Sequence, residues 1–399
     1  MAEWKECTIS EIGTVVGGAT PSTKKSENYE KGDIAWITPK DLSNFHGRYI
    51  ERGERNITEI GLKSCSAQLL PPNTILFSSR APIGYVAIAK NKVCTNQGFK
   101  SVIPNKNIDP LFLFYLLKYN KDAIENMGSG TTFKEVSGNT MKNILVKIPV
   151  SISEQRKIAE ILGSLDDKIE ENERINNNLE QQAQALFKAW FVDFETNLGT
   201  MPTTWKIVSL SSIARISTEV FSPSKNPNVE VEHYSIPALD DKHYPIFEKS
   251  DGIKSNKYRL THNSVMISKL NPDTKRIWRP YCISNTPVCS TEFIVYEPVE
   301  ASYRDFVYSI IDNEKFSNFL CAHTTGSTNS RQRVTPSITL NYDIVLPDDE
   351  TIDLFSSIVS LMYDTIENNI KENQLLAETR DKLLPKLMSG EIDVSAIDL

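Results

Sequence analysis

The sequence predicts an α+β protein in which two similar α/β domains are separated by two long helices packed as an antiparallel coiled coil. Two observations predict this class. Residue pairs recur in the same order at separations of 190 to 201 positions, which is typical of an internally duplicated chain. Two segments also carry apolar residues at alternating spacings of four and three, the 3.5-residue period of a coiled-coil seam.

The duplication is visible from the first residues onward. Trp4-Lys5 recurs as Trp205-Lys206, and Val136 recurs 198 positions later as Val334. Sequence identity between the two copies is low, so the evidence for duplication is that the matching pairs occur in the same order. It divides the chain into four segments: a first domain at 1–150, a central helix at 151–195, a second domain at 196–350 and a C-terminal helix at 351–399.

Each domain mixes strand and helix signals. Short β-rich runs at 33–37, 74–77 and 85–89 are bounded by Pro, Gly and Asn. The apolar run 110–117 predicts a buried helix, and its counterpart in the second copy lies at 303–311. Because strands and helices do not alternate regularly, we expect a compact α+β domain with a largely antiparallel sheet.

The two helical segments share a seam with the same interruption. Each seam carries two Asn at matching central positions, and buried Asn in a coiled coil costs stability but fixes the register. The predicted seam residues are Leu162, Leu165, Ile169, Asn172, Asn176, Leu179 and Leu186 in the first helix and Val359, Met362, Ile366, Asn369, Asn373, Leu376 and Leu383 in the second.

The order of segments predicts how the helices pair. A helix of about 33 residues is roughly 50 Å long, and it delivers the chain from the first domain to the second. The second helix must run back if the two seams are to meet, so we expect antiparallel packing. The alternative is that each helix packs separately on its own domain.

Composition places the chain among ordinary globular proteins. It has 399 residues, with 40% hydrophobic and 24% charged, and no apolar run approaches the about 20 residues of a membrane span. The start shows no secretory signal, and six cysteines without close pairs fit reduced thiols, so we expect a cytoplasmic protein with no membrane partner. The net charge is −7, and both helical segments are acidic at −5 each.

The motifs of common catalytic and metal sites are missing. The chain has no P-loop, no G-x-G-x-x-G after a strand and no H-E-x-x-H. Cys282 and Cys289 lack a second pair to complete a zinc site. His233 and His243 flank Asp240-Asp241, a set whose residue types suit a metal or acid-base cluster, but a surface loop is the better explanation. We therefore expect no catalytic residues, no metal and no bound cofactor in this chain.

Polyanion-binding features are better represented. Segments 129–134 and 326–333 occupy matching positions in the two copies, and both join a Gly-Ser-Thr turn to a cation. Such turns let backbone amides and hydroxyls meet phosphates, and Arg can pair with guanine in the major groove. Ordinary solvated loops are the alternative. The candidate DNA-binding residues are Arg80, Ser129, Thr131, Thr132, Lys134, Lys269, Lys275, Arg276, Arg279, Ser327, Thr328, Asn329, Arg331 and Arg333.

Taken together, these features resemble the specificity (S) subunit of a type I restriction-modification system, over essentially the whole chain. The segments that carry the resemblance are Trp4–Ile37, Pro149–Ala159 around Glu154-Gln155, Leu186–Phe194 and Leu384–Ile392. One departure is that the second helix is entered through Asp348-Asp-Glu350 and lacks the Glu-Gln pair.

The resemblance implies a division of labour. Each domain would be a target recognition domain that reads one half of a bipartite double-stranded DNA site, and the helices would set the gap and dock two methyltransferase (M) subunits. Those partners would carry S-adenosylmethionine and methylate adenine N6. Restriction (R) subunits would use ATP and Mg to translocate and cleave DNA, and this chain would catalyse nothing itself.

Two other functions are considered. A self-contained DNA methyltransferase or nuclease would show activity as an isolated chain, and the missing motifs argue against it. A coiled-coil adaptor with protein-binding domains would show no salt-dependent affinity for duplex DNA, whereas phosphate contacts produce a steep salt dependence.

Overall fold

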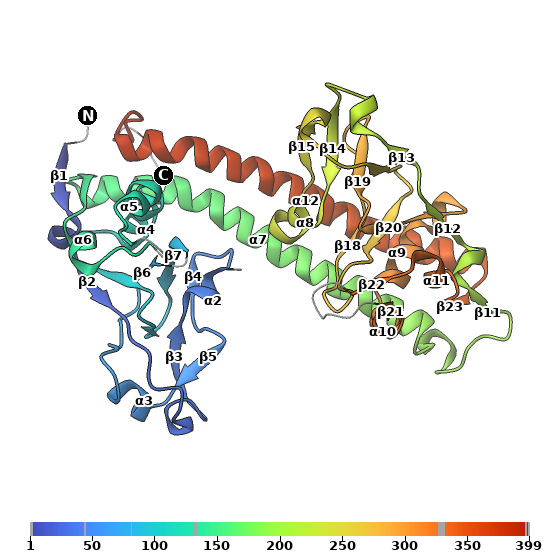
Figure 1. Cartoon of the computed structure of the whole chain (residues 1–399), viewed down its shortest axis with the longest axis horizontal. Helices are drawn as coiled ribbons and strands as arrows, with labels where there is room; N and C mark the ends of the chain where they lie inside the picture. The colour runs from blue at the N-terminus through green and yellow to red at the C-terminus, as the bar shows by residue number, and fades with distance from the viewer. Residues whose placement is uncertain are drawn as a thin grey trace. The chain divides into compact units, whose positions relative to one another are not determined.

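The computed structural model describes residues 3–43, 45–80, 82–130, 134–325, 332–395 and 397. Contacts divide the chain into two compact units, Met1–Glu170 with Leu375–Leu399 and Glu171–Gln374. Two long helices, α7 (Ile152–Phe191) and α12 (Asp349–Ser389), each contribute to both units (Figure 1). We call residues 3–150 head 1 and residues 196–348 head 2.

Head 1 is built on a five-stranded sheet of order β2-β9-β6-β7-β4, in which the β4–β7 pair is parallel and the other pairs are antiparallel. A three-stranded sheet of order β5-β3-β8 and the β1–β10 pair complete it. Its elements are β1 (Trp4–Thr8), α1 (Ile9–Ile12), β2 (Gly13–Gly17), β3 (Ile34–Ile37), α2 (Pro39–Ser43), β4 (Tyr49–Ile50), β5 (Arg55–Ile57), α3 (Glu59–Lys63), β6 (Ile75–Ser79), β7 (Ile83–Ala89), β8 (Cys94–Thr95), β9 (Lys100–Pro104), α4 (Pro110–Tyr119), α5 (Lys121–Asn126), α6 (Gly138–Lys142) and β10 (Leu145–Pro149).

Head 2 repeats this topology. The order β12-β20-β17-β18 matches β2-β9-β6-β7, and a five-stranded sheet of order β13-β16-β19-β14-β15 contains the counterpart of β5-β3-β8. The pairs β11–β23 and β21–β22 complete it. Its elements are β11 (Lys206–Ser209), β12 (Ala214–Ser217), β13 (Val220–Phe221), β14 (Glu230–Tyr234), α8 (Ile236–Lys242), β15 (Ile246–Lys249), β16 (Lys257–Arg259), β17 (Val265–Ser268), β18 (Ile277–Trp278), β19 (Pro287–Ser290), β20 (Phe293–Pro298), α9 (Arg304–Asp312), α10 (Glu314–Ala322), β21 (Thr324–Thr325), β22 (Arg333–Val334), α11 (Pro336–Thr339) and β23 (Asp343–Leu346).

The expected strands and buried helices are confirmed. The runs at 33–37, 74–77 and 85–89 form β3, β6 and β7, and those at 110–117 and 303–311 form α4 and α9. The start of α4 shows why: the Asp109 side chain accepts a hydrogen bond from the Phe112 N–H at 2.9 Å, and Pro110 occupies the first turn. An Asp cap followed by Pro is a strong helix-start signal.

The long helices extend beyond the predicted seams, to 40 residues in α7 and 41 in α12. The added turns are anchored in the heads. Gln155, which is 1% exposed, donates from Nε2 to the Pro149 carbonyl at 3.0 Å and accepts from the Asp109 N–H at 3.0 Å. The Gln of the Glu-Gln pair therefore ties the start of α7 to the start of α4.

The start of α12 uses a different cap. Asp348 accepts hydrogen bonds from the backbone N–H of Thr351 at 2.9 Å and from its hydroxyl at 2.8 Å, while Trp205 Nε1 donates to the other carboxylate oxygen at 3.2 Å. The hydrogen bonds from Thr351 hold the pKa of the Asp348 carboxyl below its ordinary value. The Asp348-Asp-Glu350 entry is thus a capped helix start in its own right.

Each unit has one main core that includes both helices. In unit 1, Leu162 of α7 and Leu387 of α12 join the core around Phe112. In unit 2, Phe187 of α7 and Phe355 of α12 pack with their ring centroids 6.0 Å apart in the core of head 2. Because the helix ends are part of the head cores, the contact-based units cut across the predicted helical segments. None of the described helices is long and apolar enough to cross a lipid bilayer.

Candidate nucleic-acid interface

In head 1, the predicted loop residues meet at the end of β6. Ser129 and Glu135 exchange backbone hydrogen bonds of 3.1 and 2.9 Å, and the Val136 N–H donates to the Ser79 carbonyl at 2.9 Å. This pairing places Ser129 and Lys134 beside Arg80, the residue that follows β6. Thr131 and Thr132 lie outside the described residues.

A carboxylate that the sequence analysis did not single out sits among these cations. Glu135 lies 3.8 Å from Arg80 Nη1 and 3.4 Å from the Nζ of Lys100, which opens β9. Lys134, next to Glu135 in the chain, has an exposed side chain. The cluster therefore places two cations at one carboxylate, with the exposed Lys134 next to that carboxylate in the chain. Its one sequence signal is the position of Glu135 directly after Lys134.

In head 2, the corresponding loop meets the end of β17. The Val334 N–H donates to the Lys269 carbonyl at 3.1 Å, and Arg333 forms a bidentate pair with Glu292 at 3.0 and 3.2 Å. Arg333 remains 46% exposed. Hydrogen bonding to Glu292, with the attraction of its charge, raises the pKa of the Arg333 guanidinium. Ser327, Thr328, Asn329 and Arg331 lie outside the described residues.

The two loops share one backbone framework and differ in side chains. The bond from Val136 to Ser79 corresponds to the bond from Val334 to Lys269, and the bridge partner of the first loop, Glu135, is replaced 198 positions later by Arg333. The reversal of charge at that position changes what each loop can contact. The heads therefore offer different chemistry to a ligand on the same scaffold.

Two of the remaining predicted cations of head 2 are paired with carboxylates. Arg276 forms a bidentate pair with Asp240 of α8 at 2.7 and 2.9 Å, and its side chain is 18% exposed. Lys275 donates to the Asp312 carbonyl at 2.7 Å and forms an ion pair with the Asp312 carboxylate. Each must exchange a protein partner for a phosphate before it contacts DNA.

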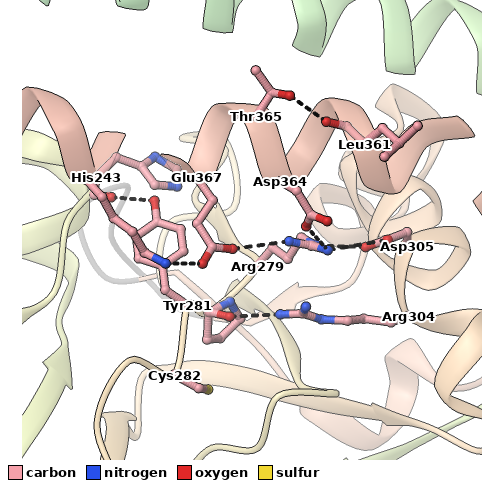
Figure 2. A network of polar contacts seen from close by, with 12 residues as sticks. His243, Arg279, Tyr281, Cys282, Arg304, Asp305, Leu361, Asp364, Thr365 and Glu367 are labelled. Carbon is pink, nitrogen blue, oxygen red and sulfur yellow. Dashed lines mark hydrogen bonds and ion pairs between the residues drawn. The ribbon is translucent and has the colours of Figure 1, made fainter. Parts of the chain in front are cut away.

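Arg279, also predicted as a DNA-binding residue, lies buried against carboxylates and is not presented to solvent. Its side chain is 10% exposed, and its guanidinium contacts Asp305 of α9 together with Asp364 and Glu367 of α12 (Figure 2). Burial opposes the charge of Arg279, but the carboxylates outweigh it and raise its pKa. The sequence prediction counted Arg279 with its neighbours Lys275 and Arg276 because chain proximity does not show which side chain points into the protein.

The helix pairing follows the asparagines of the seam. Asn172 Nδ2 donates to Asn373 Oδ1 at 2.8 Å and to Glu372 at 2.7 Å, and Asn369 Nδ2 donates to Asn176 Oδ1 at 2.8 Å. Residue numbers rise on one helix as they fall on the other, so α7 and α12 run antiparallel in unit 2. All fourteen predicted seam residues are buried or half-buried.

Among the described residues, no group of three or more His, Cys, Asp or Glu is placed to hold a metal ion. Cys94 and Cys289 are both fully buried, and burial raises the pKa of each thiol. His233 hydrogen-bonds Glu248 across the β14–β15 pair at 2.7 Å, away from the predicted Asp240-Asp241 pair on α8.

Sequence comparisons agree on one family. The family model "Type I restriction modification DNA specificity domain" matches residues 1–181. The chain is 34% identical to the type I restriction enzyme MjaIX specificity subunit of Methanocaldococcus jannaschii, covering 99% of this chain and 95% of that protein. It is 24% identical to the HindI specificity subunit of Haemophilus influenzae, over 98% of this chain and all of that protein.

The fold has a solved counterpart. The type I restriction-modification S subunit from M. genitalium superposes with a TM-score of 0.61 at 17% identity, covering 97% of this chain and 96% of that chain. At this identity the likeness concerns the fold alone: two mixed α/β heads with long helices.

Proposed function

The chain belongs to the family of type I restriction-modification DNA specificity subunits, and from this premise we propose that each head reads one half of a bipartite DNA site. The role of the chain is DNA recognition, and it is a non-catalytic component of the enzyme complex. The observation that supports one half-site for each head is the loop framework, which recurs in both heads with different side chains.

The phosphate contacts of this proposal come from the least engaged cations at the loop junctions. Lys134 is exposed and Lys269 is half-buried, and neither forms an ion pair that the structure describes. Arg80 and Arg333 lie beside them with carboxylate partners that a phosphate or a guanine edge can replace. We therefore assign the lysines to phosphate contacts that position the DNA, and the arginines to contacts that select its base sequence.

The helices supply the assembly surface. Leu354 and Leu361 are 56% and 70% exposed and lie seven residues apart, so they share one face of α12 within unit 2. We assign this face to docking of the methyltransferase subunits, which would carry S-adenosylmethionine. ATP and Mg would belong to the restriction subunits. The acidic helices suit a protein partner better than DNA, because phosphates would be repelled by them.

Deletion of the gene tests the proposal directly. When the neighbouring genes are intact, we expect modification-detecting long-read sequencing of the host DNA to show one split, adenine-methylated motif that disappears on deletion and returns on complementation. The physical reason is that the partners methylate only where the heads hold DNA. An unchanged methylation pattern would contradict the proposal and favour the coiled-coil adaptor.

Salt dependence tests the phosphate contacts. The variants Lys134→Ala and Lys269→Ala are each expected to reduce the slope of log affinity against log salt by about 1, because each removes one released counterion. The recognised motif should stay the same. Binding of the complex to duplex DNA over a salt series measures the slope, and exposed Lys382 of α12 provides a matched control. Slopes equal to the wild-type slope in both variants would remove these lysines from the interface.

A further inference from the structure

In unit 2, one buried arginine joins head 2 to a long helix. Arg279, directly after β18, donates from Nε to Asp305 at 2.7 Å, from Nη2 to Asp364 at 2.9 Å and from Nη1 to Glu367 at 3.3 Å. Figure 2 shows the guanidinium between Asp305 on one side and Glu367 on the other, with Asp364 above it. All three guanidinium nitrogens therefore have carboxylate partners.

In unit 1, a second buried arginine joins head 1 to the other long helix. Arg48, directly before β4, is 6% exposed at its side chain. Its guanidinium forms a bidentate pair with Glu170 at 2.9 and 3.1 Å, an ion pair with Asp167 and a 3.2 Å hydrogen bond to the Gly163 carbonyl. Glu170 also accepts the backbone N–H of Arg48 at 3.0 Å.

The acceptors of the two arginines are repeat-equivalent. Asp364 and Glu367 follow Asp167 and Glu170 by 197 positions each, the same offset that relates the seam asparagines. The arginines are not equivalent, since Arg48 enters through the β4 edge of its sheet and Arg279 follows β18. The two heads thus contact repeat-equivalent pairs of helix carboxylates through arginines that lie at different positions in their folds.

These ion pairs fix the orientation of each head more than they add to the stability of the fold. A planar guanidinium with bidentate and bifurcated carboxylate partners tolerates little rotation, whereas apolar packing accommodates sliding. Buried ion pairs contribute little net stability, but they can specify one arrangement among several of similar energy. An arginine held this way therefore fixes the angle and height of its head on its helix.

We propose that Arg48 and Arg279 are positioning residues, one in each unit, that lock each head on its helix and thereby restrict the DNA gap to a single length. This inference rests on the proposed function. Adding one base pair to a gap moves the two half-sites apart by about 3.4 Å and rotates one by roughly 35°. A displacement of that size breaks hydrogen bonds of the lengths observed here.

We call the Arg279 network of unit 2 and the Arg48 network of unit 1 the two locks. The test replaces the charged side chains of each lock by neutral ones, in the full chain assembled with its partner subunits. One variant carries Arg279→Met, Asp305→Asn, Asp364→Asn and Glu367→Gln, and the other carries Arg48→Met, Asp167→Asn and Glu170→Gln. Both variants remove the arginine together with its carboxylate partners, and in the first the side chain of Lys371, which is 33% exposed, also loses its ion pair with Glu367. The matched control, Arg259→Met with Glu219→Gln, removes an ion pair of 3.5 Å that joins two segments within head 2.

Long-read methylation sequencing supplies the readout. Both lock variants are expected to methylate sites whose gap is one base pair longer or shorter, and the ratio of these to sites with the wild-type gap should rise at least about tenfold, the change that accompanies 1.4 kcal/mol of lost discrimination. The control should keep the wild-type ratio. A purely structural role would lower methylation without changing the gap, and that result would overturn the inference.

Two outcomes separate this inference from its premise. Absence of any split motif with the wild-type chain would refute the proposed function itself, whereas a wild-type motif with an unchanged gap in the lock variants would refute only the positioning role. If a neutral variant gives no methylation, Arg279→Lys and Arg48→Lys decide, because lysine keeps the charge without the planar geometry. A relaxed gap supports the proposal, and a single unchanged gap overturns it.

Discussion

Exchange of residues 206–346 for the corresponding segment of a relative with a different specificity is expected to change one half of the methylated DNA motif and leave the other half intact. The exchanged segment runs from the start of β11 to the end of β23, which pair with each other and close head 2 at its junction with the helices. The change should be complete, because sites that carry only the old half lose all of their head 2 contacts.

The controls for this exchange follow from the same pairing. Head 1 closes through the β1–β10 pair, so exchange of residues 4–149 should change only the opposite half. The gap should remain constant in both chimaeras, provided that Asp305 and Arg279 are retained in head 2 and Arg48 in head 1. If a single exchange altered both halves of the motif, the two heads would not read DNA independently.

Much of the architecture was predictable because it repeats. The seam period, its matched asparagines and the recurring loop positions are local patterns, and each is visible twice. The paired asparagines across α7 and α12 lie where the heptad spacing predicts them. Helix ends were less predictable, because Gln155 and Asp348 stabilise them through contacts with distant segments.

The candidate interface was predictable only in outline. Loop composition and repeat position located Arg80, Lys134 and Arg333, but charge alone does not distinguish an exposed cation from a buried one. Arg279 belongs to the same basic stretch as Lys275 and Arg276 and yet contacts carboxylates that lie up to 88 positions away. Glu135, Lys100 and Glu292 escaped notice because their partners come from other strands.

The buried position of Arg279 makes its replacement by a small neutral residue costly for the stability of unit 2. Arg279→Ala is expected to destabilise this unit by about 3–5 kcal/mol, because it leaves the Asp305 carboxylate, 8% exposed, without its guanidinium partner and leaves Glu367 with Lys371 alone. Hydrogen exchange of the slowest amides in α9 and β17 measures the loss, and exchange should accelerate by about two to three and a half orders of magnitude. Arg259→Ala, which breaks a more exposed pair, should cost about 0–1 kcal/mol.

The comparison with the neutralised lock shows what kind of contribution Arg279 makes. Replacing Arg279, Asp305, Asp364 and Glu367 together by neutral side chains removes both the attraction and the cost of burying charge, so unit 2 should regain most of the stability that Arg279→Ala loses. Equal destabilisation by the single and the combined replacement would mean that the ion pairs stabilise the fold outright. If stability recovers and the gap relaxes, the role of the network is instead to orient head 2 on α12. Unit 2 would then fold without these charges but would no longer hold head 2 in one arrangement on the helix.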